Sequence, residues 1–189
     1  MVDRAMLRPR ATLTAMTTDD RANDHSSEIA RLAAIRAAYA ALAPQVAAGE
    51  PWPLAEAFGT EPEASWGPRE VLAHVVEMLP FWLGELERVV DGTPEPVPFG
   101  RNSNDAVRIG LIGRERTLPL RVLFARIDGD LEAWSNRLAT LTEPERGKMG
   151  LHPRLGEMRC GAITGRFVLG HAEEHVAQLQ AIIATRSDG

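Results

Sequence analysis

Hydrophobic residues recur at steps of three and four positions along four segments of this chain. Three segments span residues 28–49, 68–90 and 117–141, and the last runs from residue 163 to the C-terminus. This spacing places apolar side chains on one face of an α-helix, whereas a half-buried strand alternates apolar and polar residues. The pattern therefore predicts four long helices, and no segment shows the alternation that is typical of a strand.

The segments between the predicted helices are rich in proline and glycine, which interrupt helices. One of them, residues 91–107, separates the second helix from the third and reads "DGTPEPVPFGRNSNDAV". These features predict an all-α fold, a four-helix bundle with a long loop between helices two and three. Residues 1–24 have no sustained periodicity, so we expect a disordered tail there, with Met16 as an alternative start and one domain over residues 25–189.

Composition narrows the classes of function. The 189 residues are 44% hydrophobic but contain no apolar run near the ~20 residues that cross a bilayer, and no secretory signal, so we expect a soluble protein. A net charge of −5, with the basic residues scattered, argues against a nucleic-acid partner. The single cysteine, Cys160, excludes an internal disulfide and fits the reducing cytoplasm, where we expect the protein to reside.

Three histidines fall on the apolar faces of the predicted helices. His171 and His175, in the stretch "GHAEEHVAQL", share the apolar stripe of the last helix, and His74 lies near that of the second helix. Four residues turn a helix about 40° past a full circle and advance it about 6 Å, so His171 and His175 can reach one ion. They are either hydrogen-bonded core residues or ligands of a shared metal, which would satisfy one nitrogen of each imidazole.

The same stretch also fits H-x-x-E-H, an inverted zinc-protease motif. Proteins with that motif take a third ligand from a glutamate well downstream, and the residues after His175 include no glutamate. The protease interpretation is therefore rejected, and the missing ligand must lie upstream, where His74 is the best candidate. Glu173 and Glu174 are expected on the flanks of the helix, either solvated or in salt bridges.

Other polar residues are weaker candidates for the site. Cys160 would lie about 16 Å from His171 along a continuous helix, which is too far to share its ion. His152 lies in a loop, where it either lines the site or is solvated, and His25 is assigned to the tail. We expect two loops to frame the opening of the site. Their arginines are either solvent-exposed or bind an anionic thiol or acid, and they are Arg101, Arg108, Arg154 and Arg159.

These features resemble the DinB-like superfamily of four-helix metalloproteins, a group that includes the YfiT-type proteins and the mycothiol-dependent maleylpyruvate isomerase domain. The segment "SWGPREVLAHVVEM" is similar to the family's Trp-led second helix, and "GHAEEHVAQL" to its HxxxH fourth helix followed by Gln. The resemblance covers about residues 28–186. It implies a divalent ion, most often zinc or nickel, held by His74, His171 and His175 with a coordination position open to water or substrate.

Three functions are carried forward from this resemblance. The leading hypothesis is activation of a low-molecular-weight thiol, such as mycothiol or bacillithiol, for transfer or isomerisation. We do not expect the added C-terminal domain of the isomerases in this protein, which counts against isomerisation. The second is metal-dependent hydrolysis by metal-bound hydroxide, with Glu77 or Glu174 as the base. The third is a non-enzymatic, stress-associated binding or scaffolding protein whose metal fastens two helices together. We expect a small-molecule partner and a homodimer.

Overall fold

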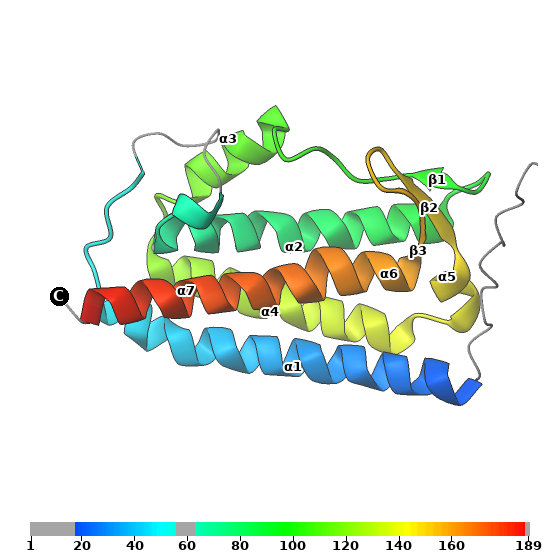
Figure 1. Cartoon of the computed structure of the whole chain (residues 1–189), viewed down its shortest axis with the longest axis horizontal. Coiled ribbons are helices and arrows are strands. Elements are labelled where there is room, and N and C mark those ends of the chain that lie inside the picture. The colour runs from blue at the N-terminus through cyan, green and yellow to red at the C-terminus, as the bar shows by residue number, and fades with distance from the viewer. Residues whose placement is uncertain (1–17, 56–62, 188–189) are drawn as a thin grey trace, which may run out of the picture.

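A bundle of long helices forms most of the protein (Figure 1). The computed structural model describes residues 18–55 and 63–187. Its three uninterrupted long helices are α1 (Thr18–Ala48), α2 (Pro68–Asp91) and α4 (Leu120–Thr140). The fourth rod of the bundle is built from three consecutive pieces, α6 (Cys160–Thr164), the π-helical turn η2 (Gly165–Gly170) and α7 (His171–Ser187).

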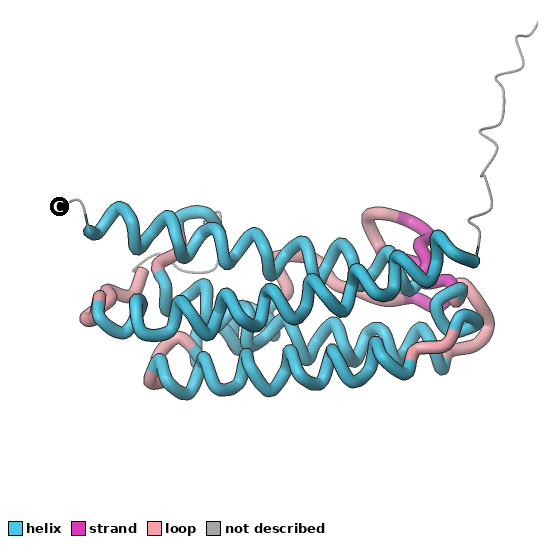
Figure 2. Tube along the Cα trace, turned by 90° about the horizontal axis from the view of Figure 1, so that it is seen from below, coloured by secondary structure: helices cyan, strands magenta, loops and turns pink. Residues whose placement is uncertain are grey.

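Short helices, turns and strands lie at the two ends of the bundle. They are the 3₁₀ turn η1 (Glu63–Ser65), the helices α3 (Ala106–Glu115) and α5 (Glu143–Gly147), and the strands β1 (Val97–Pro98), β2 (Met149–His152) and β3 (Gly156–Arg159). η1 and α3 lie near the start of α2, whereas the strands gather near its end (Figure 1). Figure 2 shows the strands together at one end of the bundle.

Helix α2 is the most buried element of the bundle. It packs against α4, α7 and α3, and α1 packs against α4 and α7. Pro68 begins α2, where its missing amide hydrogen costs nothing, and every residue from Glu70 to Leu79 is buried. Because α2 is enclosed on several sides, a polar side chain from it must find partners inside the bundle.

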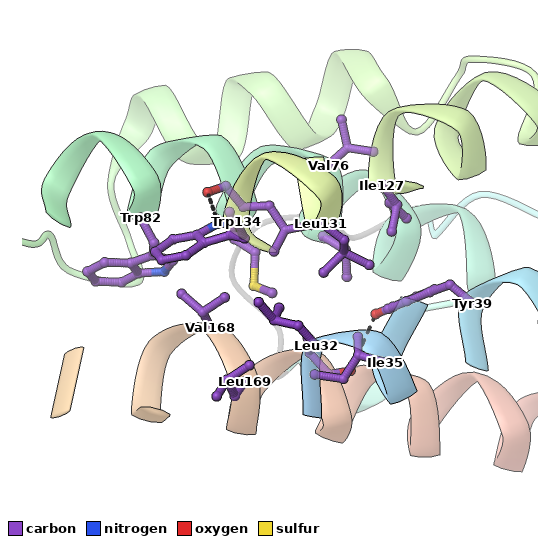
Figure 3. Close-up of a cluster of buried hydrophobic side chains, with 14 of the residues drawn as sticks. Leu32, Ile35, Tyr39, Val76, Trp82, Ile127, Leu131, Trp134, Val168 and Leu169 are labelled. Atoms are coloured by element: carbon purple, nitrogen blue, oxygen red, sulfur yellow. Dashed lines mark hydrogen bonds between the residues drawn. The ribbon is translucent and has the colours of Figure 1, made fainter. Parts of the chain in front are cut away.

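The core is formed where the four rods meet (Figure 3). Trp134 of α4 is fully buried, and its indole N–H donates to the backbone oxygen of Leu79 at 2.9 Å. Tyr39 of α1 donates from its hydroxyl to the backbone oxygen of Ala172 at 3.4 Å, so it links α1 to α7. The remaining labelled members are aliphatic or aromatic residues, among them Leu32, Ile35, Val76, Trp82, Ile127, Leu131, Val168 and Leu169.

The structure confirms the predicted all-α bundle and adds a small sheet to it. A small three-stranded sheet in the order β1-β2-β3 is present, with β1 parallel to β2 and β2 antiparallel to β3. These strands are a minor addition to the helical bundle, and the sequence pattern did not indicate them. Strands of two to four residues are too short to show a period of two. Gly156, with φ at +77°, begins β3 at the close of the hairpin turn.

The first helix also begins at a different residue from the one that the sequence pattern predicts. Residues 1–17 of the predicted tail lie outside the described residues, and α1 already begins at Thr18, ten residues before the apolar pattern starts. His25, assigned to the tail, lies instead in α1, where its Nδ1 is hydrogen-bonded to Arg146 of α5. Within the described residues, none of the helices is both long and apolar enough to cross a membrane.

Candidate metal centre

The three histidines on the apolar stripes meet at the interface of α2 and α7. The Nε2 atoms of His74 and His171 are 3.0 Å apart. The ring centroid of His175 lies 5.0 Å from that of His74 and 4.6 Å from that of His171. His74 comes from the second turn of α2, and His171 and His175 come from the first two turns of α7. The sequence therefore folds so that two helices present their imidazoles to one point.

A π-helical turn immediately precedes the two histidines of α7. This turn, η2, begins and ends with glycine, and a Cβ atom on Gly170 would lie only 3.3 Å from the backbone oxygen of Gly165. A π turn adds one residue to the helical repeat, so it changes the direction in which the following side chains point. Thus η2 sets the rotation of His171 and His175 relative to the apolar side chains before them.

A carboxylate joins the three imidazoles. Glu63 in η1 places its Oε2 atom 3.9 Å from Nε2 of His74 and 3.7 Å from Nε2 of His171. One potential ligand atom from each of Glu63, His74, His171 and His175 lies within 4.8 Å of all the others. Glu63 was not foreseen, because its loop has no periodicity. The only available signal was its position eleven residues before His74, just ahead of α2.

Gln178 fixes the orientation of His175. The Nδ1–H of His175 donates to the side-chain oxygen of Gln178 at 2.9 Å, and the amide nitrogen of Gln178 donates to the backbone oxygen of Glu63 at 2.7 Å. Because Nδ1 carries the proton, Nε2 of His175 keeps its lone pair. That Nε2 atom is buried and has no hydrogen-bond partner in the described structure. A buried, unpaired nitrogen facing two other imidazoles fits a metal ligand.

Burial keeps the three imidazoles neutral. Loss of solvent lowers the pKa of His74 well below its usual value, and the neighbouring His175 and Arg108 lower it further. Burial and the nearby His171 lower the pKa of His175 to about 4. Burial likewise lowers the pKa of His171. Only neutral imidazoles bind metals, so the cluster is ready to bind a cation near neutral pH. Three imidazole nitrogens and one carboxylate form a set of ligands that suits a divalent transition-metal ion.

Two arginine–glutamate pairs surround His74. Arg108 of α3 is hydrogen-bonded to Glu63, and its Nη2 atom lies 3.4 Å from Nδ1 of His74. Glu77, one turn after His74, lies 3.8 Å from the same Nδ1 and receives a 2.6 Å hydrogen bond from Arg101. Burial raises the pKa of Glu77. Glu77 therefore lies at the back of His74, on the side away from Glu63, with its carboxylate already paired.

The remaining predicted site residues lie outside the cluster. His152 of β2 stacks on Phe167 at a centroid distance of 5.2 Å, and its Nδ1 accepts hydrogen bonds from the backbone N–H groups of Arg154 and Leu155. Arg154, in the turn, and Arg159, at the end of β3, are exposed and belong to the same hairpin. The hairpin residues are absent from the group of ligand atoms around Glu63 in the described structure.

The two glutamates between His171 and His175 point outward. Glu173 forms an ion pair with Arg31 of α1, with its Oε2 atom 2.7 Å from the arginine Nη2. Glu174 is exposed. Cys160 is buried at the start of α6, so η2 separates it from His171.

Four helical rods with three histidines and a glutamate at one interface define a helical-bundle protein with a candidate divalent-metal site. The chain belongs to the DinB superfamily, whose family model matches residues 31–179. Its fold is similar to that of YfiT from Bacillus subtilis, a protein described as "a probable metal-dependent hydrolase with an unusual four-helix bundle topology". That match has a TM-score of 0.65 and 15% sequence identity, and covers 96% of this chain and 94% of YfiT. No curated protein matches the chain.

Proposed function

We propose that this protein is a metal-dependent hydrolase of small molecules. One observation carries the proposal: a partly exposed carboxylate, that of Glu63, lies beside three neutral imidazoles whose nitrogen atoms converge. His74, His171 and His175 would hold the ion. A divalent ion supplies Lewis acidity, which makes a water molecule easier to deprotonate near neutral pH.

Glu63 is the group best situated to move the proton. In the proposed reaction, Glu63 takes a proton from the attacking water, and the water oxygen forms a bond to the electrophilic carbon of the substrate. The bond to the leaving group then breaks, the leaving group keeps the electron pair, and Glu63 returns the proton to it. Glu77 is less suited to this role because it lies behind His74 and only 2% of its side chain is exposed, whereas 32% of the Glu63 side chain is exposed. Glu174 is less suited because it is exposed and points away.

Thiol activation, the leading hypothesis from the sequence, uses the same three ligands but does not require a base beside them. The position of Glu63 and the description of YfiT as a probable metal-dependent hydrolase favour hydrolysis instead. Thiol transfer therefore remains a prediction without an observation of its own.

The test is a panel of ester, amide and lactone substrates offered to zinc- and nickel-loaded protein, with and without a small thiol. We expect hydrolysis that needs the metal but no thiol. Glu63→Gln should slow it at least about 100-fold while the bound metal is retained. Turnover that appears only when a thiol is added would overturn hydrolysis in favour of thiol activation.

A further inference from the structure

Arg108 is held rigidly beside the metal-site residues. Its backbone N–H donates to the side chain of Asp105, which caps α3, and its Nη1 atom donates to the backbone oxygen of Ser103 at 3.0 Å. The guanidinium carbon lies 5.7 Å from the centre of the Trp66 ring. Only 7% of the side chain is exposed. A buried, oriented guanidinium is typical of sites that recognise carboxylates and other oxyanions.

The charges around His74 require an anion once a metal is bound. Arg108 lies within 3.5 Å of both ring nitrogens of His74, close to where a divalent ion would bind. The guanidinium and the ion would repel each other strongly in this low-dielectric surrounding. Glu63 neutralises Arg108, while Glu77 is engaged by Arg101. The charge of the ion itself would therefore remain uncompensated by these side chains.

Glu63 shows how an anion fits between the arginine and the histidines. Its Oε1 atom accepts from Arg108, and its Oε2 atom faces Nε2 of His74 and of His171. The side chains of Glu63 and His171 are 32% and 29% exposed, whereas that of His74 is 3% exposed. The cluster is thus open to solvent on the side of Glu63 and His171, and a small anion can reach it there.

We infer that the substrate is a small anion whose carboxylate, or a comparable oxyanion, binds Arg108 beside the three histidines in place of the Oε1 atom of Glu63. The inference rests on the proposed hydrolase and names its substrate class.

The test is a titration of cobalt-loaded protein with acetate, followed by the visible spectrum of cobalt, with inorganic phosphate as a second probe. The variants are Arg108→Gln and, as the matched control, Arg114→Gln, which removes an exposed arginine from the same helix. We expect acetate to bind about tenfold or more weakly to Arg108→Gln and unchanged to Arg114→Gln. Glu63→Gln, which weakens the internal competitor, should bind acetate more tightly than the unaltered protein.

The outcomes separate this inference from the proposed function. Equal acetate affinity in the unaltered protein and Arg108→Gln, at equal cobalt content, would overturn the inference and leave the hydrolase proposal standing. Failure of the unaltered protein to bind cobalt would overturn both. Tighter binding of phosphate than acetate, with the same dependence on Arg108, would support a phosphorylated substrate. If Arg108→Gln does not fold, Arg108→Lys keeps the charge but loses the bidentate geometry, and it should also bind acetate more weakly.

Discussion

The Nε2 atoms of His74 and His171 lie 3.0 Å apart across the interface of α2 and α7. Burial lowers the pKa of both imidazoles, so both are neutral at physiological pH. Neutral imidazoles at this distance either share one proton or direct two lone pairs at a common cation. The unpaired Nε2 of His175 beside them favours the cation.

Gln178 should control the affinity for metal without being a ligand. Gln178→Leu removes the acceptor that keeps the proton on Nδ1 of His175, and loss of such a partner typically weakens metal binding by about 10–100-fold. Gln178→Glu keeps the acceptor for His175 and should restore part of the affinity. Cobalt titration measures the effect, and Gln180→Leu, on the exposed face of α7, is the control. Unaltered affinity in Gln178→Leu would exclude this role.

Glu63 should act on turnover more than on metal content. Glu63→Gln keeps the size of the side chain but cannot accept a proton, so kcat should fall about 10²–10⁴-fold while one metal ion per chain is retained. Metal analysis and steady-state kinetics on the same preparation separate the two effects. A variant that loses its metal in proportion to its activity would show that Glu63 is a ligand and not a base.

His152 should make stability depend on pH. Its Nδ1 accepts two backbone hydrogen bonds and therefore must stay unprotonated in the folded state. Burial and the nearby Arg154 and Arg166 lower its pKa below the usual value of about 6.5. The unfolded chain then binds the extra proton first, so His152 destabilises the folded state as the pH falls below about 6.5.

Urea unfolding at pH 7 and pH 5 tests the role of His152. The free energy of unfolding should fall less between these pH values in His152→Gln than in the unaltered protein. Comparison of the two differences cancels the contribution of every other titrating group. Equal losses in both proteins would contradict the prediction.

Trp134 should affect the fold and leave the metal site intact. Trp134→Phe removes buried volume and the hydrogen bond to Leu79, which should lower the free energy of unfolding by about 1–3 kcal/mol. Chemical denaturation measures this loss, and cobalt affinity under native conditions should not change. A large loss of metal in this variant would show that the core and the site are coupled.

Periodicity predicted the parts of this protein that lie on helices. The apolar stripes located the four rods, and the histidines on those stripes lie together because the stripes face each other in the bundle. Glu63 lies in a loop, where no period shows which side chains turn inward. Arg108 was one of four arginines in the loops, and its burial depends on the way α3 folds over α2. Tertiary packing, which the local pattern does not encode, decided both positions.

The most direct test of the account is the metal content of purified protein, measured by elemental analysis beside three single variants and one control. We expect one divalent ion per chain in the unaltered protein and in His25→Ala, whose histidine lies outside the cluster. The variants His74→Ala, His171→Ala and His175→Ala should each retain far less than one ion per chain while keeping a helical circular dichroism spectrum. Metal-free unaltered protein after incubation with zinc or nickel, or full metal content in all three variants, would contradict the account.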